Sequence, residues 1–427
     1  MGDGGGGNGR GSKVALALAG GGLAGAIYEI GALRALDEAL DGFDFNQAFL
    51  YVGVSAGAFL NACLANDLTT AQMCRAIVST EPGEHPFVAE TFLTPTFKRL
   101  AGSASALPRL LFEALRDYTA RPAEKSLLGS LTRLSRLLPV AWFDNEPMRA
   151  YLERIYGIKN RTDDFRQLGK RLIVVATDLD SGRAVRFGEP GLDHVPISRA
   201  VQASSALPGF YPPVEIDGHR YVDGILIKTV HASVALEAGA ELVLCLNPLV
   251  PVDMELARGA GYAGGTLVDQ GLPTVLSQAV RTLVHSRLEV GMSAYGRKFA
   301  GADVVLFEPQ PEDHRMFFTN IFGFSERRTV VEHAYRSTRR ELLRRAPELE
   351  PILARHGITL RTDLLSDPER DLWESVGLKK PEPAERRKRA PESSFTDRLD
   401  DALNRLGAWA DARAESDAAR ASPPSSR

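Results

Sequence analysis

The stretch FLYVGVSAGA, residues 49–58, decides the fold class of this 427-residue chain. Its first six residues, Phe49–Val54, form an apolar run of the kind that builds a strand buried in a parallel sheet. A G-x-S-x-G pattern centred on Ser55 closes this run, and residues 58–66 have the composition of a helix. The sequence therefore predicts a strand that passes into a helix through a sharp turn at Ser55.

An earlier stretch has the same order of elements. Val14–Ala19 is a short apolar run that ends in three glycines at residues 20–22, and apolar side chains then recur at helical spacing over residues 24–40. Two strand–turn–helix units within about sixty residues indicate an α/β fold with right-handed crossovers. We expect three layers, with a mostly parallel central sheet between helices.

Later segments extend this pattern. Strands are expected at Leu172–Thr177, Arg183–Phe187 and Glu241–Leu246. Helices are expected at residues 194–206, 229–238, 291–299 and 326–345. We predict one domain over residues 13–345, a C-terminal helical extension over 346–378, a glycine-rich disordered tail over 1–12, and a mostly disordered charged tail over 379–427 that contains a short amphipathic helix at about 395–412.

Composition excludes several classes of protein. Hydrophobic residues make up 44% of the chain and charged residues 25%, as in globular proteins, and the net charge of -3 offers no general attraction to nucleic acid. Three cysteines without a CxxC pair argue against a disulfide framework or a zinc site and suit a reducing compartment. We expect a cytoplasmic protein without a metal or cofactor.

The N-terminus shows no secretory signal, and no run of eighteen apolar residues occurs, so any membrane contact is expected to be peripheral, at the inner membrane surface. The span of about residues 98–138, within an expected helical and basic insertion at about 90–142, has leucines at helical spacing among arginines. Such helices either pack their leucines on the domain, which is the commoner case, or lie on an anionic bilayer.

Ser55 is the first candidate for chemistry. A serine on a strand-to-helix turn projects from the carboxyl edge of the sheet, and Gly53 and Gly57 let neighbouring elements pass close to it. The helix N-terminus behind the serine favours a developing negative charge.

The second candidate is the loop Gly20-Gly21-Gly22-Leu23-Ala24-Gly25. It fits G-x-G-x-x-G after a strand, which is a dinucleotide-binding pattern. That interpretation requires an acidic residue at the end of the second strand, whereas Asp41 and Asp44 precede that strand. We therefore favour an oxyanion hole built from the N–H groups of this loop, with a tight structural turn as the alternative. Its expected residues are Gly20, Gly21, Gly22, Leu23 and Gly25.

A base for Ser55 is the third requirement. Asp223-Gly224 lies downstream of the segment 203–214, and no histidine occupies a C-terminal loop of the kind that a Ser–His–Asp triad uses. His231 is the one histidine that merits a test.

Together these blocks resemble the patatin-like phospholipases. That family's ordered signature is a glycine-rich oxyanion loop, G-x-S-x-G, an A-S-x-A-x-P segment that runs into P-P-V, and a D-G pair, and all four occur here in order. The resemblance implies a patatin-like fold and a Ser–Asp dyad, with Ser55 as nucleophile and Asp223 as base beside Gly224. It also implies that Gly21, Gly22 and Leu23 supply oxyanion N–H groups and that the substrates are acyl esters of phospholipids or other lipids.

Two other functions stay open. An acyltransferase would use the same acyl-enzyme with an alcohol as acceptor. A non-catalytic lipid-binding or scaffold protein would carry a degenerate site, since Ala24 and Ile225 differ from the residues usual in the family. A triad hydrolase that uses His231 is a further alternative.

Overall fold

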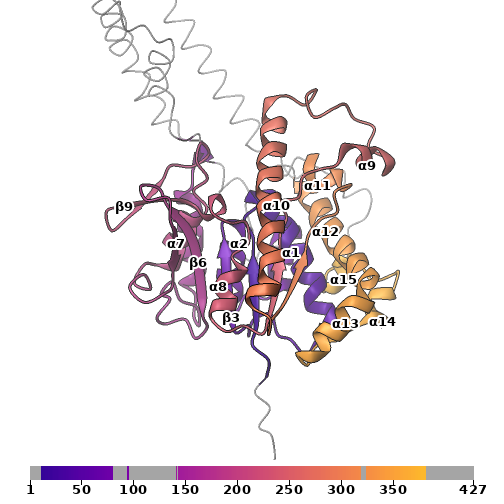
Figure 1. Cartoon of the computed structure of the whole chain (residues 1–427), viewed down its shortest axis with the longest axis horizontal. Coiled ribbons are helices and arrows are strands. Elements are labelled where there is room, and N and C mark those ends of the chain that lie inside the picture. The colour runs from indigo at the N-terminus through magenta and orange to yellow at the C-terminus, as the bar shows by residue number, and fades with distance from the viewer. Residues whose placement is uncertain (1–10, 80–93, 96–140, 142, 319–323, 381–427) are drawn as a thin grey trace, which may run out of the picture.

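The computed structural model describes residues 11–79, 94–95, 141, 143–318 and 324–380 (Figure 1). These residues form an eight-stranded sheet in the order β11-β10-β1-β3-β6-β9-β8, with β7 paired to β6. The strands are β1 (Val14–Leu18), β3 (Leu50–Val54), β6 (Leu172–Asp178), β7 (Ala184–Phe187), β8 (Val214–Ile216), β9 (His219–Asp223), β10 (Leu242–Leu246) and β11 (Asp303–Phe307).

Five strands, β11, β10, β1, β3 and β6, run parallel, whereas β7, β8 and β9 are antiparallel to their neighbours. The chain enters β1 from the lower side of Figure 1, so the carboxyl ends of the parallel strands face the upper side. This arrangement confirms the α/β class with a mostly parallel central sheet.

Helices cover both faces of the sheet. They are α1 (Gly22–Ala39), α2 (Ala56–Ala65), α3 (Thr70–Val78), α6 (Glu146–Tyr156), α7 (Ile197–Ser204), α8 (Ala232–Glu237), α9 (Met254–Gly259), α10 (Leu272–Lys298), α11 (His314–Phe318) and α12 (Phe324–Arg344). Alternate side chains of β1 point to opposite faces of the sheet. Leu16 and Leu18 pack with α1, α2 and α12, whereas Ala15 and Ala17 pack with α8 and the second half of α10. The result is a helix–sheet–helix sandwich.

Residues 346–378 join the core on the α1 side. They form α13 (Ala346–Arg355), β12 (Thr359–Leu360), α14 (Thr362–Ser366) and α15 (Leu372–Ser375), and β12 pairs with the short strand β2 (Leu40–Asp41). Leu349, Leu353 and Trp373 are buried in the same cluster as α1 and α12. The predicted extension therefore packs as part of the core.

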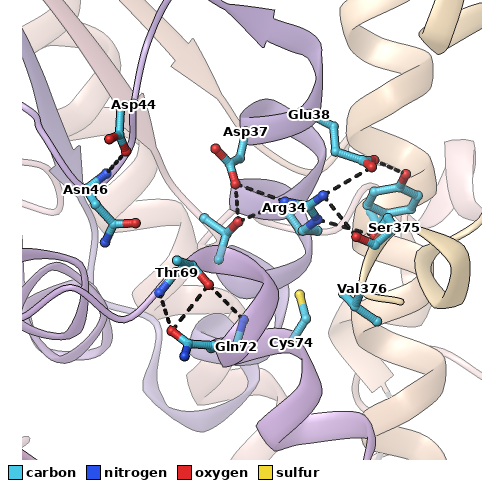
Figure 2. Close-up of polar contacts among 12 residues, drawn as sticks. Arg34, Asp37, Glu38, Asp44, Asn46, Thr69, Gln72, Cys74, Ser375 and Val376 are labelled. Atoms are coloured by element: carbon cyan, nitrogen blue, oxygen red, sulfur yellow. Dashed lines mark hydrogen bonds and ion pairs between the residues drawn. The ribbon is translucent and has the colours of Figure 1, made fainter. Parts of the chain in front are cut away.

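A polar network fastens this region to α1 (Figure 2). Arg34 donates to the hydroxyl oxygen of Ser375 at 3.3 Å and to its carbonyl oxygen at 3.0 Å. It also pairs with Glu38 at 3.1 Å, and Glu38 in turn contacts Tyr335 and Arg370. Glu38 is 8% exposed, and the two arginines and the Tyr335 hydroxyl satisfy its carboxyl oxygens in place of water.

Several predicted elements differ in extent from the structure. The helix expected at 291–299 is the end of α10, which begins nineteen residues earlier at Leu272. The helix expected from residue 194 begins at Ile197. The antiparallel hairpin β8–β9 was not expected. The N-terminal tail up to residue 10, most of the basic insertion and the C-terminal tail from residue 381 lie outside the described residues, as does the predicted helix at 395–412.

None of the described helices combines the length and the apolar character needed to cross a bilayer.

The thiols of Cys63, Cys74 and Cys245 are all buried and free. Burial raises the pKa of each thiol, to about 12 for Cys63 and Cys74.

Candidate active site

Ser55 occupies the turn between β3 and α2. Its φ of 52° and ψ of -119° lie outside the regions that non-glycine residues favour, which is the strained geometry of a nucleophile turn. The side chain is 5% exposed, and the N-terminus of α2 begins at the next residue. The predicted strand–turn–helix around Ser55 is thus present.

Two glycines make this turn sterically feasible. A Cβ on Gly53 would come within 2.4 Å of Ala58 Cα, and one on Gly57 would come within 2.4 Å of the Leu18 carbonyl group. Both distances are far below van der Waals contact, so a side chain at either position would push β3, α2 and β1 apart. The glycines of G-x-S-x-G are therefore required by close packing of backbone against backbone.

Ser204, at the end of α7, fixes the backbone of Ser55. Its hydroxyl oxygen accepts the Ser55 N–H at 2.8 Å and donates to the Val175 carbonyl at 2.6 Å. Ser204 is completely buried, so both bonds are shielded from water. Sequence reasoning did not assign Ser204 a role, although it is the serine of the A-S-x-A-x-P block.

Asp223 is the last residue of β9, and its strand register places it beside Ser55. Val54 pairs with Val175 of β6, and Asp223 pairs with the next residue of β6, Ala176. Ser55, which directly follows Val54, and Asp223 therefore lie on either side of β6 at the same level, although they are 168 positions apart in the sequence.

The environment of Asp223 perturbs its carboxyl group. Burial raises its pKa to about 7, while hydrogen bonds from the Ile225 N–H and the Ser55 hydroxyl lower that pKa. The Ile225 N–H donates to Asp223 Oδ1 at 2.9 Å, and the Thr177 hydroxyl donates to the Asp223 carbonyl at 3.0 Å. The carboxyl group is thus oriented toward Ser55 and carries a pKa suited to proton transfer near neutral pH.

The glycine loop lies on the other side of Ser55. A Cβ on Gly20 would be 3.1 Å from Ser55 Cβ, so the loop passes directly over the serine. Gly22 has a φ of +59° and begins α1, which explains the glycine there. Within the described residues, no backbone or side-chain acceptor takes the N–H groups of Gly22 and Leu23. These donors at a helix N-terminus can bind an anion.

Gly25 is placed differently from the rest of the loop. Its N–H donates to the Gly21 carbonyl at 3.0 Å and is engaged within the loop. Its missing side chain instead makes room for Pro248, because a Cβ there would be 2.8 Å from Pro248 Cγ. Gly21 lies against the same proline, because a Cβ on Gly21 would be 2.5 Å from Pro248 Cγ.

Glu29 of α1 is a further buried group behind the loop. Its Oε1 accepts the Ala19 N–H at 3.1 Å, and the Ala19 carbonyl accepts the Gly57 N–H at 2.9 Å. Burial raises the pKa of Glu29 well above its usual value, because the charged form is poorly solvated there. The peptide of Ala19 therefore links α1 to the serine turn, a connection that no local pattern in the sequence revealed.

His231 lies near the aspartate loop but points elsewhere. It is 4% exposed, its Nε2 has no hydrogen-bond partner among the described residues, and the backbone of Gly224 and Lys228 lies beside the ring. Burial lowers its pKa to about 4, so the ring is neutral. In the described part of the chain, no group of three histidine, cysteine or acidic side chains is placed to hold a metal ion.

The fold and this constellation define an α/β protein with a serine turn, a buried aspartate and an N–H-rich glycine loop at one sheet edge. The family described as patatin-like phospholipase matches residues 16–236, more than half of the chain. The chain therefore belongs to the patatin-like phospholipase family, a family of lipid acyl hydrolases.

Among solved structures, the chain is similar to the crystal structure of VipD from Legionella pneumophila. The two are 15% identical with a TM-score of 0.33, and the match covers 77% of this chain. It covers 66% of the VipD chain, slightly under two thirds of its length.

Proposed function

We propose that this protein hydrolyses acyl esters of phospholipids or related lipids through a Ser55–Asp223 dyad and an acyl-enzyme intermediate. The observation that carries the proposal is the juxtaposition of a strained, buried Ser55 with the carboxyl group of Asp223, whose pKa is raised to about 7. Membership of the patatin-like phospholipase family supplies the class of substrate.

The first half-reaction forms the acyl-enzyme. Asp223 in its ionised form accepts the hydroxyl proton of Ser55 as Oγ bonds to the acyl carbonyl carbon. The carbonyl oxygen becomes an oxyanion, which the N–H groups of Gly21, Gly22 and Leu23 stabilise together with the N-terminus of α1. The intermediate collapses, the ester C–O bond breaks, and the leaving alcohol takes the proton from Asp223.

The second half-reaction restores the enzyme. Asp223 accepts a proton from a water molecule, whose oxygen attacks the acyl carbon and forms a second oxyanion in the same N–H pocket. Collapse breaks the bond to Ser55 Oγ, which takes back the proton. The fatty acid leaves, and no oxidant, metal or cofactor is required.

The test compares Ser55→Ala and Asp223→Asn with the wild type on a panel of phospholipids, lysophospholipids and short p-nitrophenyl esters. We expect both variants to lose about a thousandfold or more of the rate. Ser205→Ala is the matched control, because Ser205 is a buried serine next to Ser204 and is not a member of the dyad. Hydrolysis retained in Ser55→Ala would overturn the proposal.

Labelling and product analysis separate the rival functions. A fluorophosphonate probe should label the wild type and not Ser55→Ala, whereas a scaffold protein with a degenerate site would not be labelled. Adding an alcohol acceptor to the assay distinguishes hydrolysis from acyl transfer, because a transferase would yield a new ester in place of free fatty acid. His231→Ala should retain activity, since the carboxyl group of Asp223 is bonded by Ile225 and Ser55 and not by this ring.

A further inference from the structure

Large exposed apolar side chains are unevenly distributed over the described residues. Twelve are exposed, and five of them belong to the first half of α10, which lies at the carboxyl ends of the strands, the edge that carries Ser55 (Figure 1). These five are Leu272, Val275, Leu276, Val280 and Leu283. Scattered apolar residues on a surface need no explanation, but a concentration on one half of a helix marks an interaction surface.

Four of these five residues form a row along the first half of α10. Leu272, Leu276, Val280 and Leu283 recur at intervals of four, four and three residues, which places them along one face of the helix. They are 51–69% exposed. In Figure 1 this half of α10 rises beyond the carboxyl ends of the strands, whereas the second half lies against the sheet.

Polar bonds on another side of the helix hold this half in place. Gln278 exchanges hydrogen bonds with the backbone N–H and carbonyl of Val252, at 3.1 and 2.7 Å. Arg281 donates to the Val250 carbonyl at 3.1 Å. The helix is therefore supported by the segment that precedes α9, and its apolar face remains uncovered by these contacts.

The same helix is bonded directly to the loop that follows Asp223. Arg287 donates to the carbonyl groups of Leu226 and Ile227, at 3.1 and 2.9 Å. Leu226 itself is 44% exposed and stands three residues after Asp223. The helix that carries the apolar face is thus bonded to the loop that follows Asp223.

The charge of α10 is one-sided over this region. No aspartate or glutamate occurs from residue 270 to residue 288. Arg281 and His285 lie on the opposite side of the helix, where Arg281 bonds to the Val250 carbonyl and His285 contacts Glu308 at 3.3 Å, whereas Arg287 lies on the apolar side. An apolar helix face that carries an arginine and no acidic residue suits the surface of a lipid bilayer that contains anionic lipids.

We infer that the apolar face of α10, residues 272–283, together with Leu226, docks into a lipid surface and holds the Ser55 edge against it. This inference rests on the proposed function, because a lipid substrate makes the bilayer the natural partner of that edge. A second copy of the chain is the competing occupant. Docking would let an ester group enter the site from the bilayer without crossing bulk water.

The experiment uses the paired change Leu276→Gln with Val280→Gln. Vesicle sedimentation on phosphatidylglycerol–phosphatidylcholine vesicles should show roughly tenfold or greater loss of binding, because two apolar side chains no longer enter the bilayer. Hydrolysis of vesicle lipid should fall in parallel, while kcat/KM on dissolved p-nitrophenyl butyrate stays unchanged. Val290→Gln is the matched control, since Val290 is 71% exposed on the second half of the same helix.

Each outcome is decisive. Unchanged vesicle binding by the paired variant overturns the docking surface, as does wild-type protein that cleaves the dissolved ester but does not sediment with vesicles. A concentration-dependent dimer that the paired variant abolishes also overturns it, in favour of a second copy. Wild-type protein that binds vesicles through α10 but cleaves neither substrate supports docking and refutes the proposed hydrolysis instead.

Discussion

The carboxyl group of Asp223 links the chemistry of this site to pH. Its pKa is raised to about 7 by burial, and only the ionised form can accept the Ser55 proton. We therefore expect kcat/KM on a dissolved ester to rise between about pH 6 and about pH 8, with a midpoint near that pKa. A pH profile in a constant-ionic-strength buffer measures this. A rate independent of pH across that range would contradict the role of Asp223 as base.

The same shift predicts a cost in stability. The pKa of Asp223 is higher in the folded than in the unfolded chain, so the protonated carboxyl group stabilises the fold fully below about pH 4, and this contribution is lost as the pH rises toward 7. Asp223→Asn cannot ionise and avoids this loss. The free energy of unfolding of the variant should therefore exceed that of the wild type by an amount that grows across this window to about 2–4 kcal/mol and then levels off. Denaturant unfolding of both proteins at about pH 5 and pH 8 tests this linkage.

Ser204 gives a prediction about positioning. In Ser204→Ala the N–H of Ser55 loses its buried acceptor, which should cost roughly 1–3 kcal/mol of stability. The freed turn should lower kcat about 10- to 100-fold with little change in KM. Ser204→Thr keeps a hydroxyl group and should recover part of kcat if the added methyl group is accommodated. Equal kcat in the wild type and Ser204→Ala would show that the bond does not position Ser55.

At this scale the sequence indicated which residues to examine but not their surroundings. Ser55 was predicted from its strand-to-helix turn, whereas Asp223 was predicted from the ordered blocks around it and from the lack of a suitably placed histidine. The pKa of Asp223, the bond from Ser204 and the contact of Glu29 with Ala19 all depend on burial and on segments distant in the chain. Such properties follow from packing, which no local pattern encodes.

At the scale of elements, the serine turn depends on how closely β1, β3 and α2 approach one another. Gly57→Ala should destabilise the protein by roughly 1–3 kcal/mol or more, because its Cβ would overlap the Leu18 carbonyl. Activity should fall as well, since the turn carries Ser55. Gly169→Ala is the control, as a Cβ there meets nothing within 4 Å. Similar melting temperatures for both variants would contradict this account of the turn.

The elements themselves were predictable where their apolar periodicity is strong and local. The runs at Val14 and Phe49 were correctly expected to be strands. The hairpin β8–β9 was missed because its strands are three and five residues long and border a proline-rich segment. The first half of α10 was missed although Leu272, Leu276, Val280 and Leu283 recur at helical spacing, so this part of the helix could have been predicted from the sequence.

At the scale of the molecule, we propose that residues 13–378 fold as one cooperative unit. Trp373 is 4% exposed and packs in the core shared with α1 and α12. Trp373→Ala should therefore cost about 3–5 kcal/mol and lower the melting temperature of the whole chain in a single transition. Leu343→Ala, at a residue 39% exposed on α12, should have little effect. Two separate transitions would instead indicate an independent C-terminal unit.

The burial of all three thiols has a practical consequence. Cys63, Cys74 and Cys245 are held inside the core with raised pKa values, so a maleimide reagent at neutral pH should leave the folded wild type unmodified. A new surface cysteine could therefore be labelled selectively without first replacing the three natural ones. Leu276→Cys could carry an environment-sensitive fluorophore, whose emission would report in real time whether and how deeply that residue enters hydrocarbon.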